Sequence, residues 1–109
     1  MTLVKVAETS EIPQGQMKAF KLSGKEVLIA NVNGNYYAIA NRCTHRNGDL
    51  SKGSLDGNIV TCPVHGARFD LTTGKAVAGP KIAFLRSKTS DEASYQVKIE
   101  GRDVMIDIK

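Results

Sequence analysis

Short apolar stretches alternate with turn sequences along the first 40 residues. Four of these stretches are predicted to be strands, over residues 3–6, 17–22, 26–32 and 36–40. The β-branched content of residues 26–32 favours a strand over a helix. Ser23-Gly24 and Asn33-Gly34-Asn35 separate neighbouring stretches, and Asn and Gly readily adopt the positive φ angles of tight turns. The pattern therefore predicts consecutive hairpins.

The same pattern returns in the second half of the chain, where it predicts strands over residues 58–61, 67–71, 75–78, 95–99 and 103–108. Each expected turn contains a glycine: Asp56-Gly57, Thr73-Gly74 and Glu100-Gly101-Arg102. Residues 50–55 follow neither a helical nor a strand period, and the polar segment 87–94 is predicted to be an exposed excursion. Because we find no internal repeat and no amphipathic helix, we expect an all-β protein.

The length of the chain limits its organisation. A sequence of 109 residues can bury one core and is too short for a second domain of any size, so we expect residues 1–109 to form a single domain. No apolar run approaches the length needed to cross a bilayer, and we expect no membrane attachment.

All the cysteine and histidine in the chain lies in two short segments. Cys43-Thr44-His45 is followed, after sixteen intervening residues, by Cys62-Pro63-Val64-His65. Zinc sites usually separate the two ligands of a chelating pair by two to four residues, whereas one residue separates Cys43 from His45. A two-iron cluster relaxes this demand, because the Cys and the His of one loop can bind different irons. A structural zinc site and two polar turns without metal remain as alternatives.

At these residues the sequence resembles the Rieske family, whose pattern is Cys-x-His, a spacer and Cys-x-x-His. The resemblance extends to Gly66-Ala67-Arg68-Phe69-Asp70 and to Ala78-Gly79-Pro80, which looks like the proline-containing loop of the family. It implies the Rieske fold, an antiparallel β-sandwich or open barrel with a small cluster-binding subdomain of two loops, here roughly residues 41–82. It also implies a [2Fe-2S] cluster, with Cys43 and Cys62 on the inner iron and His45 and His65 on the outer iron.

Several departures from the high-potential branch of the family bear on the reduction potential. Ala67 and Phe69 stand where that branch carries a serine and a tyrosine hydroxyl, and Gly48 and Val64 stand where it carries a disulfide. Without the hydroxyl donors the reduced cluster is less stabilised, so we expect a potential at the low end of the range of about −150 to +300 mV for Rieske centres. Gly66, like Gly48, suits either a close backbone approach to the cluster or an ordinary turn.

The resemblance implies a soluble one-electron carrier, a Rieske-type ferredoxin that is not itself an enzyme. Its expected partners are a ferredoxin reductase and an acceptor protein such as a terminal oxygenase. Since the sequence ends after a predicted strand, where oxygenase subunits of the family continue into a catalytic domain, we expect a complete carrier. We also expect a monomer. The alternative is a small Rieske subunit bound within an oxidoreductase complex of the nitrite reductase or oxygenase type.

The charge of the chain gives a weaker indication of its partners. The formal net charge is +4, but the lysines are scattered and no nucleic-acid motif is found, so we expect no nucleic-acid partner. Residues 42–81 hold six basic and three acidic side chains, which is typical either of a surface for an acidic partner or of a solvated face. With both cysteines assigned as ligands, none is left for a disulfide, and we expect a cytoplasmic protein.

Overall fold

The computed structural model describes residues 3–22, 24–42, 49–64, 66–78, 81–82, 85–86 and 91–107. Regular structure in these residues is almost entirely β-strand, with two short 3-10 helices, η1 (Thr9–Glu11) and η2 (Leu50–Lys52). The all-β prediction is therefore confirmed. No helix within the described residues is long and apolar enough to cross a membrane.

A four-stranded antiparallel sheet lies at the centre of the protein, in the strand order β11-β4-β3-β2. Its strands are β2 (Met17–Leu22), β3 (Lys25–Val32), β4 (Asn35–Ala40) and β11 (Ser94–Tyr95). The β3–β4 turn has φ angles of 54° at Asn33 and 88° at Gly34, as a two-residue hairpin turn requires. The two hairpins predicted from the Gly-containing turns are confirmed.

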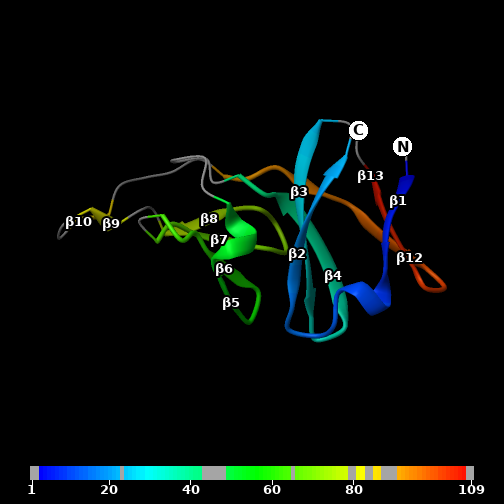
Figure 1. Ribbon diagram of the computed structural model, residues 1–109. Coiled ribbons are helices and arrows are strands. Elements are labelled where there is room, and N and C mark those ends of the chain that lie inside the picture. Colours follow the sequence, from blue (N-terminus) through cyan, green and yellow to red (C-terminus); the bar gives the residue numbers. More distant parts are fainter. Residues whose placement is uncertain are drawn as a thin grey trace.

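A second sheet, of order β1-β13-β12, covers one side of the central sheet (Figure 1). It is formed by β1 (Leu3–Glu8), β12 (Val97–Glu100) and β13 (Asp103–Asp107). The single strand predicted over residues 95–99 is wrong, because the chain changes sheets within it. Tyr95 pairs with Ala38 of the central sheet, whereas Val97 pairs with Ile106 of the second sheet.

The third sheet, of order β5-β6-β7-β8, lies on the other side of the central sheet (Figure 1). Its short strands are β5 (Ser54–Asp56), β6 (Ile59–Thr61), β7 (Arg68–Asp70) and β8 (Ala76–Ala78). Strand β5 was not expected, because residues 50–55 divide between the whole of η2 and a strand too short to show a period. A separate pair, β9 (Lys81–Ile82) and β10 (Leu85–Arg86), completes the described strands.

Two apolar clusters fill the spaces between the three sheets, and β3 contributes to both. Leu28 and Ala30 face the third sheet, while Val27 and Ile29 face the second. We call the cluster on the side of the third sheet the inner cluster. Its buried members are Leu28, Ala30, Ile39, Leu50, Val60, Cys62, Ala67, Phe69 and Leu71. Because β3 is buried on both faces, its sequence is continuously apolar from Val27 to Ala30.

The prediction of an exposed excursion over residues 87–94 is wrong at Glu92. Residues 87–90 lie outside the described residues, and Asp91 is exposed, but Glu92 is only 5% exposed. Its backbone N–H donates to the carbonyl of Gly74 across 2.7 Å, and a Cβ built on Gly74 would lie 2.3 Å from the Glu92 carbonyl oxygen. The next residue, Ala93, accepts a hydrogen bond from Ala40, which draws this segment onto the central sheet.

Candidate metal centre

The first predicted ligand loop leaves the central sheet at the end of β4. An isolated antiparallel bridge joins Arg42, which directly precedes Cys43 in the sequence, to Asp49. The predicted ligands Cys43 and His45, like Gly48, fall within residues 43–48, which lie outside the described residues. What the structure describes is therefore the base of this loop.

Buried polar contacts hold that base together. Asn41 is fully buried, and its Nδ2 donates to Asp49 Oδ1 across 2.8 Å. The Asn41 Oδ1 accepts the backbone N–H of Ser51 at 3.0 Å, and the Asn41 carbonyl accepts that of Leu50 at 2.9 Å. Asp49 is also the N-cap of η2, since its side chain accepts the Ser51 N–H.

The Asp49 carboxyl is held ionised by its surroundings. The Ser51 hydroxyl donates to it, as do Asn41 and the backbone N–H of Ser51, and Arg42 adds an attractive charge. These contacts hold the pKa of Asp49 below its ordinary value, against the opposing effect of burial. Beside it, the Arg42 guanidinium donates to Glu26 across 2.9 Å and lowers the pKa of that carboxyl.

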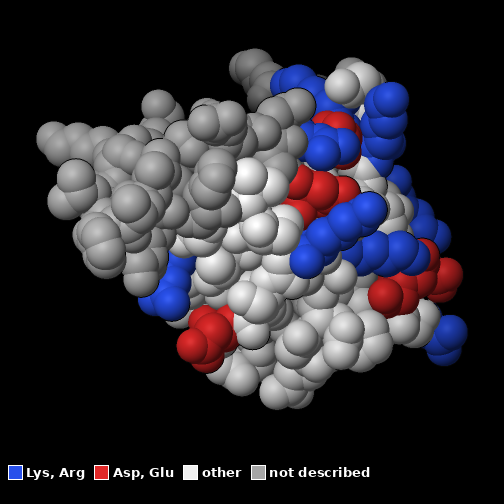
Figure 2. Space-filling model, turned by 60° about the vertical axis from the view of Figure 1, so that its left-hand side comes forward, with Lys and Arg blue, Asp and Glu red and all other residues white. Residues whose placement is uncertain are grey.

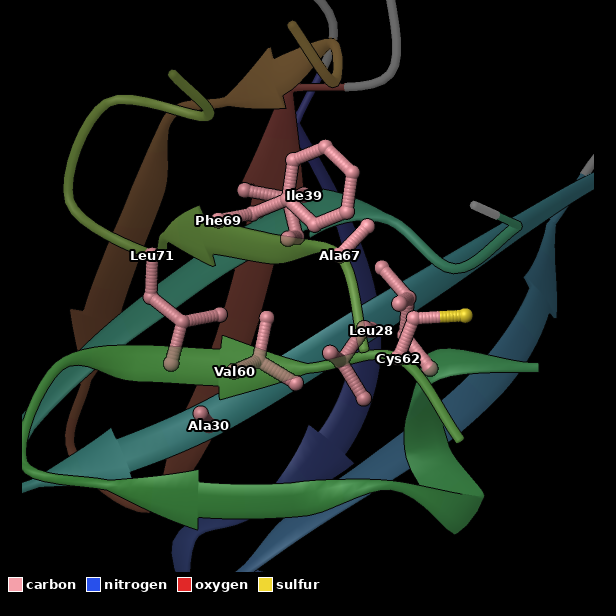
Figure 3. Packing of buried hydrophobic residues seen from close by; sticks show 9 residues of the cluster. Leu28, Ala30, Ile39, Val60, Cys62, Ala67, Phe69 and Leu71 are labelled. Atoms are coloured by element: carbon pink, nitrogen blue, oxygen red, sulfur yellow. The ribbon is translucent and has the colours of Figure 1, made fainter. Parts of the chain in front are cut away.

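Cys62 is the one predicted ligand within the described residues, and it lies at the end of β6. It is 1% exposed, and its backbone N–H donates to the carbonyl of Ala67 at 2.7 Å. The Cys62 sulfur accepts the backbone N–H of Val64 at 3.4 Å. Figure 3 shows the sulfur at the edge of the inner cluster, directed away from the side chains of Val60 and Leu71. The fourth predicted ligand, His65, lies outside the described residues.

This environment fits a cysteine thiolate bound to iron. A buried thiolate needs a compensating cation or hydrogen bonds, and the Val64 N–H supplies one such bond to the sulfur of Cys62. Hydrogen bonds to cluster sulfur atoms are also among the factors that set the potential of an iron–sulfur site. Since the sulfur lies at the edge of the inner cluster and points away from Val60 and Leu71, a metal bound to it would lie on the side away from these core residues.

Ala67 and Phe69 belong to the same inner cluster as this cysteine and are fully buried. Neither side chain offers a hydrogen-bond donor. The part of the inner cluster that borders the loop is therefore apolar and excludes water, in keeping with the expectation of a low-potential centre. Figure 3 shows Ala67 at the start of β7, across from Cys62.

Two glycines shape the second loop for different reasons. Gly66 has a φ of 74°, and a Cβ built there would meet nothing within 4 Å among the described residues. Its positive φ is a conformation that glycine adopts without strain. Gly53, which the sequence analysis did not single out, has the opposite property: a Cβ there would lie 1.9 Å from the Thr61 carbonyl oxygen and 3.2 Å from Pro63. This close approach seats the segment after the first loop against the strand that enters the second.

The surface around the site is of mixed charge in its described part. Figure 2 shows basic and acidic side chains interspersed on that face. Two of the three acids counted between residues 42 and 81, Asp49 and Asp70, accept hydrogen bonds within the fold. The basic excess there is consequently carried by side chains that point outward, such as the exposed Lys52, Arg68 and Lys75.

Comparison with known proteins places this arrangement in a family. The model of the Rieske [2Fe-2S] domain matches residues 2–89. The ferredoxin component of a naphthalene 1,2-dioxygenase system from Pseudomonas aeruginosa is 41% identical over 98 residues, covering 90% of this chain and 88% of that protein. The ferredoxin component of a biphenyl 2,3-dioxygenase from Rhodococcus jostii is 34% identical, covering 100% of this chain and 95% of that one.

Solved structures show the same relationship. The ferredoxin of carbazole 1,9a-dioxygenase from Nocardioides aromaticivorans matches with a TM-score of 0.84 and 28% identity over 100% of both chains. A complex of reduced oxygenase and oxidised ferredoxin in carbazole 1,9a-dioxygenase matches with a TM-score of 0.84 and 27% identity, over 95% of this chain and 91% of that one. The chain belongs to the Rieske [2Fe-2S] domain family, as a ferredoxin-type member whose cofactor is a [2Fe-2S] cluster.

Proposed function

We propose that this protein carries single electrons from a ferredoxin reductase to the terminal oxygenase of a dioxygenase system. The observation that carries the proposal is the match, over nine tenths or more of this chain, to proteins named as ferredoxin components of naphthalene and biphenyl dioxygenases. The structural match to a ferredoxin in complex with its oxygenase supports an oxygenase as the acceptor.

The proposed ligands are Cys43 and Cys62 through their thiolates and His45 and His65 through their imidazoles. The [2Fe-2S] cluster supplies reversible one-electron oxidation and reduction when it is bound. The described residues shape its surroundings: Val64 donates a backbone hydrogen bond to the Cys62 sulfur, and Ala67 keeps the adjoining core apolar. Neutral imidazole ligands remove negative charge from one iron and raise the potential above that of an all-cysteine cluster.

In this role the protein delivers electrons and does not transform a substrate. Residues 1–109 act as a single domain, monomeric and located in the cytoplasm with the enzymes that it serves. The formal charge of +4 suits an acidic docking surface on the partner. The length of the chain and the presence of only two cysteines, both assigned as ligands, support this part of the proposal.

The experiment is purification without oxygen, followed by iron and acid-labile sulfide analysis, a visible spectrum and voltammetry. We expect two irons and two sulfides per chain, as the cofactor implies, and a reversible one-electron wave. Electron transfer is then measured with the reductase and oxygenase of a naphthalene dioxygenase system. Zinc without sulfide would contradict the proposal, and co-elution with larger subunits on size-exclusion chromatography would favour the bound-subunit alternative.

Two variants sharpen the test. Cys62→Ser removes a proposed ligand and is expected to abolish the cluster spectrum. Val77→Ala, at a position 53% exposed on β8, serves as the control for a small surface change and is expected to keep the spectrum and the potential. A Cys62→Ser protein that retained the wild-type spectrum and potential would exclude Cys62 as a ligand.

A further inference from the structure

The bases of the two predicted ligand loops are closed by the same pair of residue types. Before the first loop, Asn41 donates from Nδ2 to Asp49 Oδ1 across 2.8 Å. Around the second loop, Asn58 donates from Nδ2 to Asp70 Oδ1 across 3.0 Å. Each Asn precedes the Cys of its loop, and each Asp follows the His. Both pairs of predicted ligands are therefore enclosed between an Asn and an Asp that contact one another.

A second contact, made by the residue after each Asp, is also present at both loops. Leu50 donates its backbone N–H to the carbonyl of Asn41 at 2.9 Å, and Leu71 donates its own to the carbonyl of Asn58 at 2.8 Å. Both leucine side chains are buried in the inner cluster that contains Cys62. Backbone and side chain of each Asn thus both reach the segment that leaves the loop.

The second residue after each Asp supplies a third contact. Ser51 donates to Asp49 Oδ1 from its backbone N–H at 3.1 Å and from its hydroxyl at 2.5 Å. Thr72 donates to Asp70 Oδ1 from its N–H at 2.8 Å and from its hydroxyl at 2.6 Å. In the sequence the two arrangements read Asp-Leu-Ser and Asp-Leu-Thr. We name them the first-loop clasp (Asn41, Asp49, Leu50, Ser51) and the second-loop clasp (Asn58, Asp70, Leu71, Thr72).

The clasps differ in burial. Asn41 is fully buried and has an additional bond, because its Oδ1 accepts the Ser51 N–H at 3.0 Å. Asn58 is partly exposed, so water can replace some of its contacts. Removing one partner of a buried polar pair leaves the other unsatisfied, and that penalty is larger where water has no access. Breaking the first-loop clasp is therefore expected to cost more free energy than breaking the second-loop clasp.

We propose that the two clasps are positioning devices, one for each ligand loop, that keep the proposed iron ligands in place by holding the loop ends together. This inference rests on the proposed function, since it concerns retention of the [2Fe-2S] cluster. The physical reason is that a loop whose ends are joined samples fewer conformations, so a ligand that detaches remains near its metal and rebinds. Residues that orient metal ligands without touching the metal commonly contribute 10- to 100-fold to affinity.

The experiment compares the rate of cluster loss in three Asn→Ala variants, followed by the decay of visible absorbance in the presence of an iron chelator. We expect Asn41→Ala to lose its cluster roughly 100-fold faster than the wild type, and Asn58→Ala roughly 10-fold faster. The matched control is Asn31→Ala. Asn31 is also buried, with Nδ2 donating to the Ile12 carbonyl at 2.9 Å and Oδ1 accepting the Gly34 N–H at 2.9 Å, but it encloses no ligand loop.

The comparison is made at temperatures equally far below the Tm of each variant, so that general destabilisation is removed from it. The proposal is overturned if the clasp variants then lose the cluster no faster than Asn31→Ala. A wild-type protein without any [2Fe-2S] spectrum would instead refute the proposed function. The electron paramagnetic resonance spectrum of the reduced protein gives an independent readout, since displaced ligands shift its g-values while those of Asn31→Ala stay at the wild-type values.

Two further variants remain informative if Asn41→Ala does not fold. Asp70→Asn keeps an oxygen that can accept from Asn58 and Thr72, and is expected to lose its cluster at close to the wild-type rate. Asp70→Ala removes the acceptor and is expected to match Asn58→Ala. Equal, rapid cluster loss from both Asp70 variants would show that charge, and not the hydrogen-bonded closure, retains the cluster, and would overturn the proposal.

Discussion

The backbone N–H of Cys62 lies 2.7 Å from the carbonyl oxygen of Ala67 and donates a hydrogen bond to it. This bond spans the second ligand loop, and it places a fully buried alanine across from the cysteine that carries the proposed thiolate. The four residues between the two partners include His65 and the positive-φ Gly66. A substitution at Ala67 can therefore change the surroundings of the cluster sulfur while the loop stays closed.

Ala67→Ser combined with Phe69→Tyr is expected to raise the reduction potential. Both positions are fully buried, so the new hydroxyls cannot turn to bulk water and have the cluster or cysteine sulfurs as the expected acceptors. Voltammetry of the wild type and the double variant provides the measurement. An unchanged potential with an intact cluster spectrum would show that neither hydroxyl reaches sulfur. In that case stability should also fall, by about 1–3 kcal/mol for each unsatisfied hydroxyl.

His65→Cys is expected to lower the reduction potential. The new ligand is anionic where imidazole is neutral, so the reduced state becomes harder to reach, by on the order of 100 mV given the gap between Rieske and all-cysteine clusters. Potentiometry on the cluster-loaded variant tests this. If the variant kept its cluster at an unchanged or higher potential, His65 would be excluded as an iron ligand.

Gly53→Ala is expected to destabilise the fold more than Gly66→Ala does. A methyl group at Gly53 would clash with the Thr61 carbonyl oxygen, and Thr61 cannot move freely because it belongs to a strand. We therefore expect the free energy of unfolding to fall by about 3 kcal/mol or more. At Gly66 no described residue lies within 4 Å of such a methyl group, and the expected cost is that of a positive φ, about 1–2 kcal/mol. Urea unfolding of the two variants under identical conditions measures the difference. Equal losses would contradict the close approach at Gly53.

Acid is expected to destabilise the fold through the two clasp carboxylates, Asp49 and Asp70, over a defined pH range. Hydrogen bonds from Ser51 and Thr72 hold the pKa values of Asp49 and Asp70, respectively, below the ordinary value. The ionised carboxylates thus favour the folded state above the unfolded-state pKa of about 3.9, and this contribution is lost as the pH falls through the lower folded-state values. We expect Tm to be insensitive to these groups from pH 7 to about pH 5 and to fall below about pH 4.

The control for the acid prediction removes one titrating group at a time. Asp49→Asn and Asp70→Asn each lack one of the carboxylates, so their Tm values should fall less steeply with acid than that of the wild type. Thermal unfolding followed by circular dichroism at each pH gives the comparison. A slope equal to that of the wild type in both variants would mean that the acid sensitivity arises elsewhere.

Elements that depend only on the local sequence could be predicted from the sequence. Asn33-Gly34 gives the β3–β4 hairpin because both residues adopt positive φ, and in the β12–β13 turn Gly101 has a φ of 61°. The spacing of Cys and His was sufficient to predict the family, which the comparison confirms. These predictions depend on the conformations of one or two residues or on the chemistry of the ligands. Packing against distant parts of the chain changes neither.

The features that the sequence did not disclose depend on contacts between distant segments. The burial of Glu92 follows from its hydrogen bond to Gly74, and the need for glycine at position 53 follows from the path of β6. The clasps were missed for the same reason, because Asn and Asp in a loop are usually read as turn residues. The repeated Asp-Leu-Ser and Asp-Leu-Thr sequences were the available signal.

The two-sided burial of β3 has a consequence for how the protein unfolds. Since Leu28 and Ala30 belong to the inner cluster and Val27 and Ile29 to the other, detaching either outer sheet exposes apolar surface on the strand that supports the remaining one. Partial unfolding is then nearly as costly as complete unfolding, which makes the transition cooperative. Amide protons of β3 should accordingly exchange with solvent last, and with one common free energy of opening whether they are bonded to β2 or to β4.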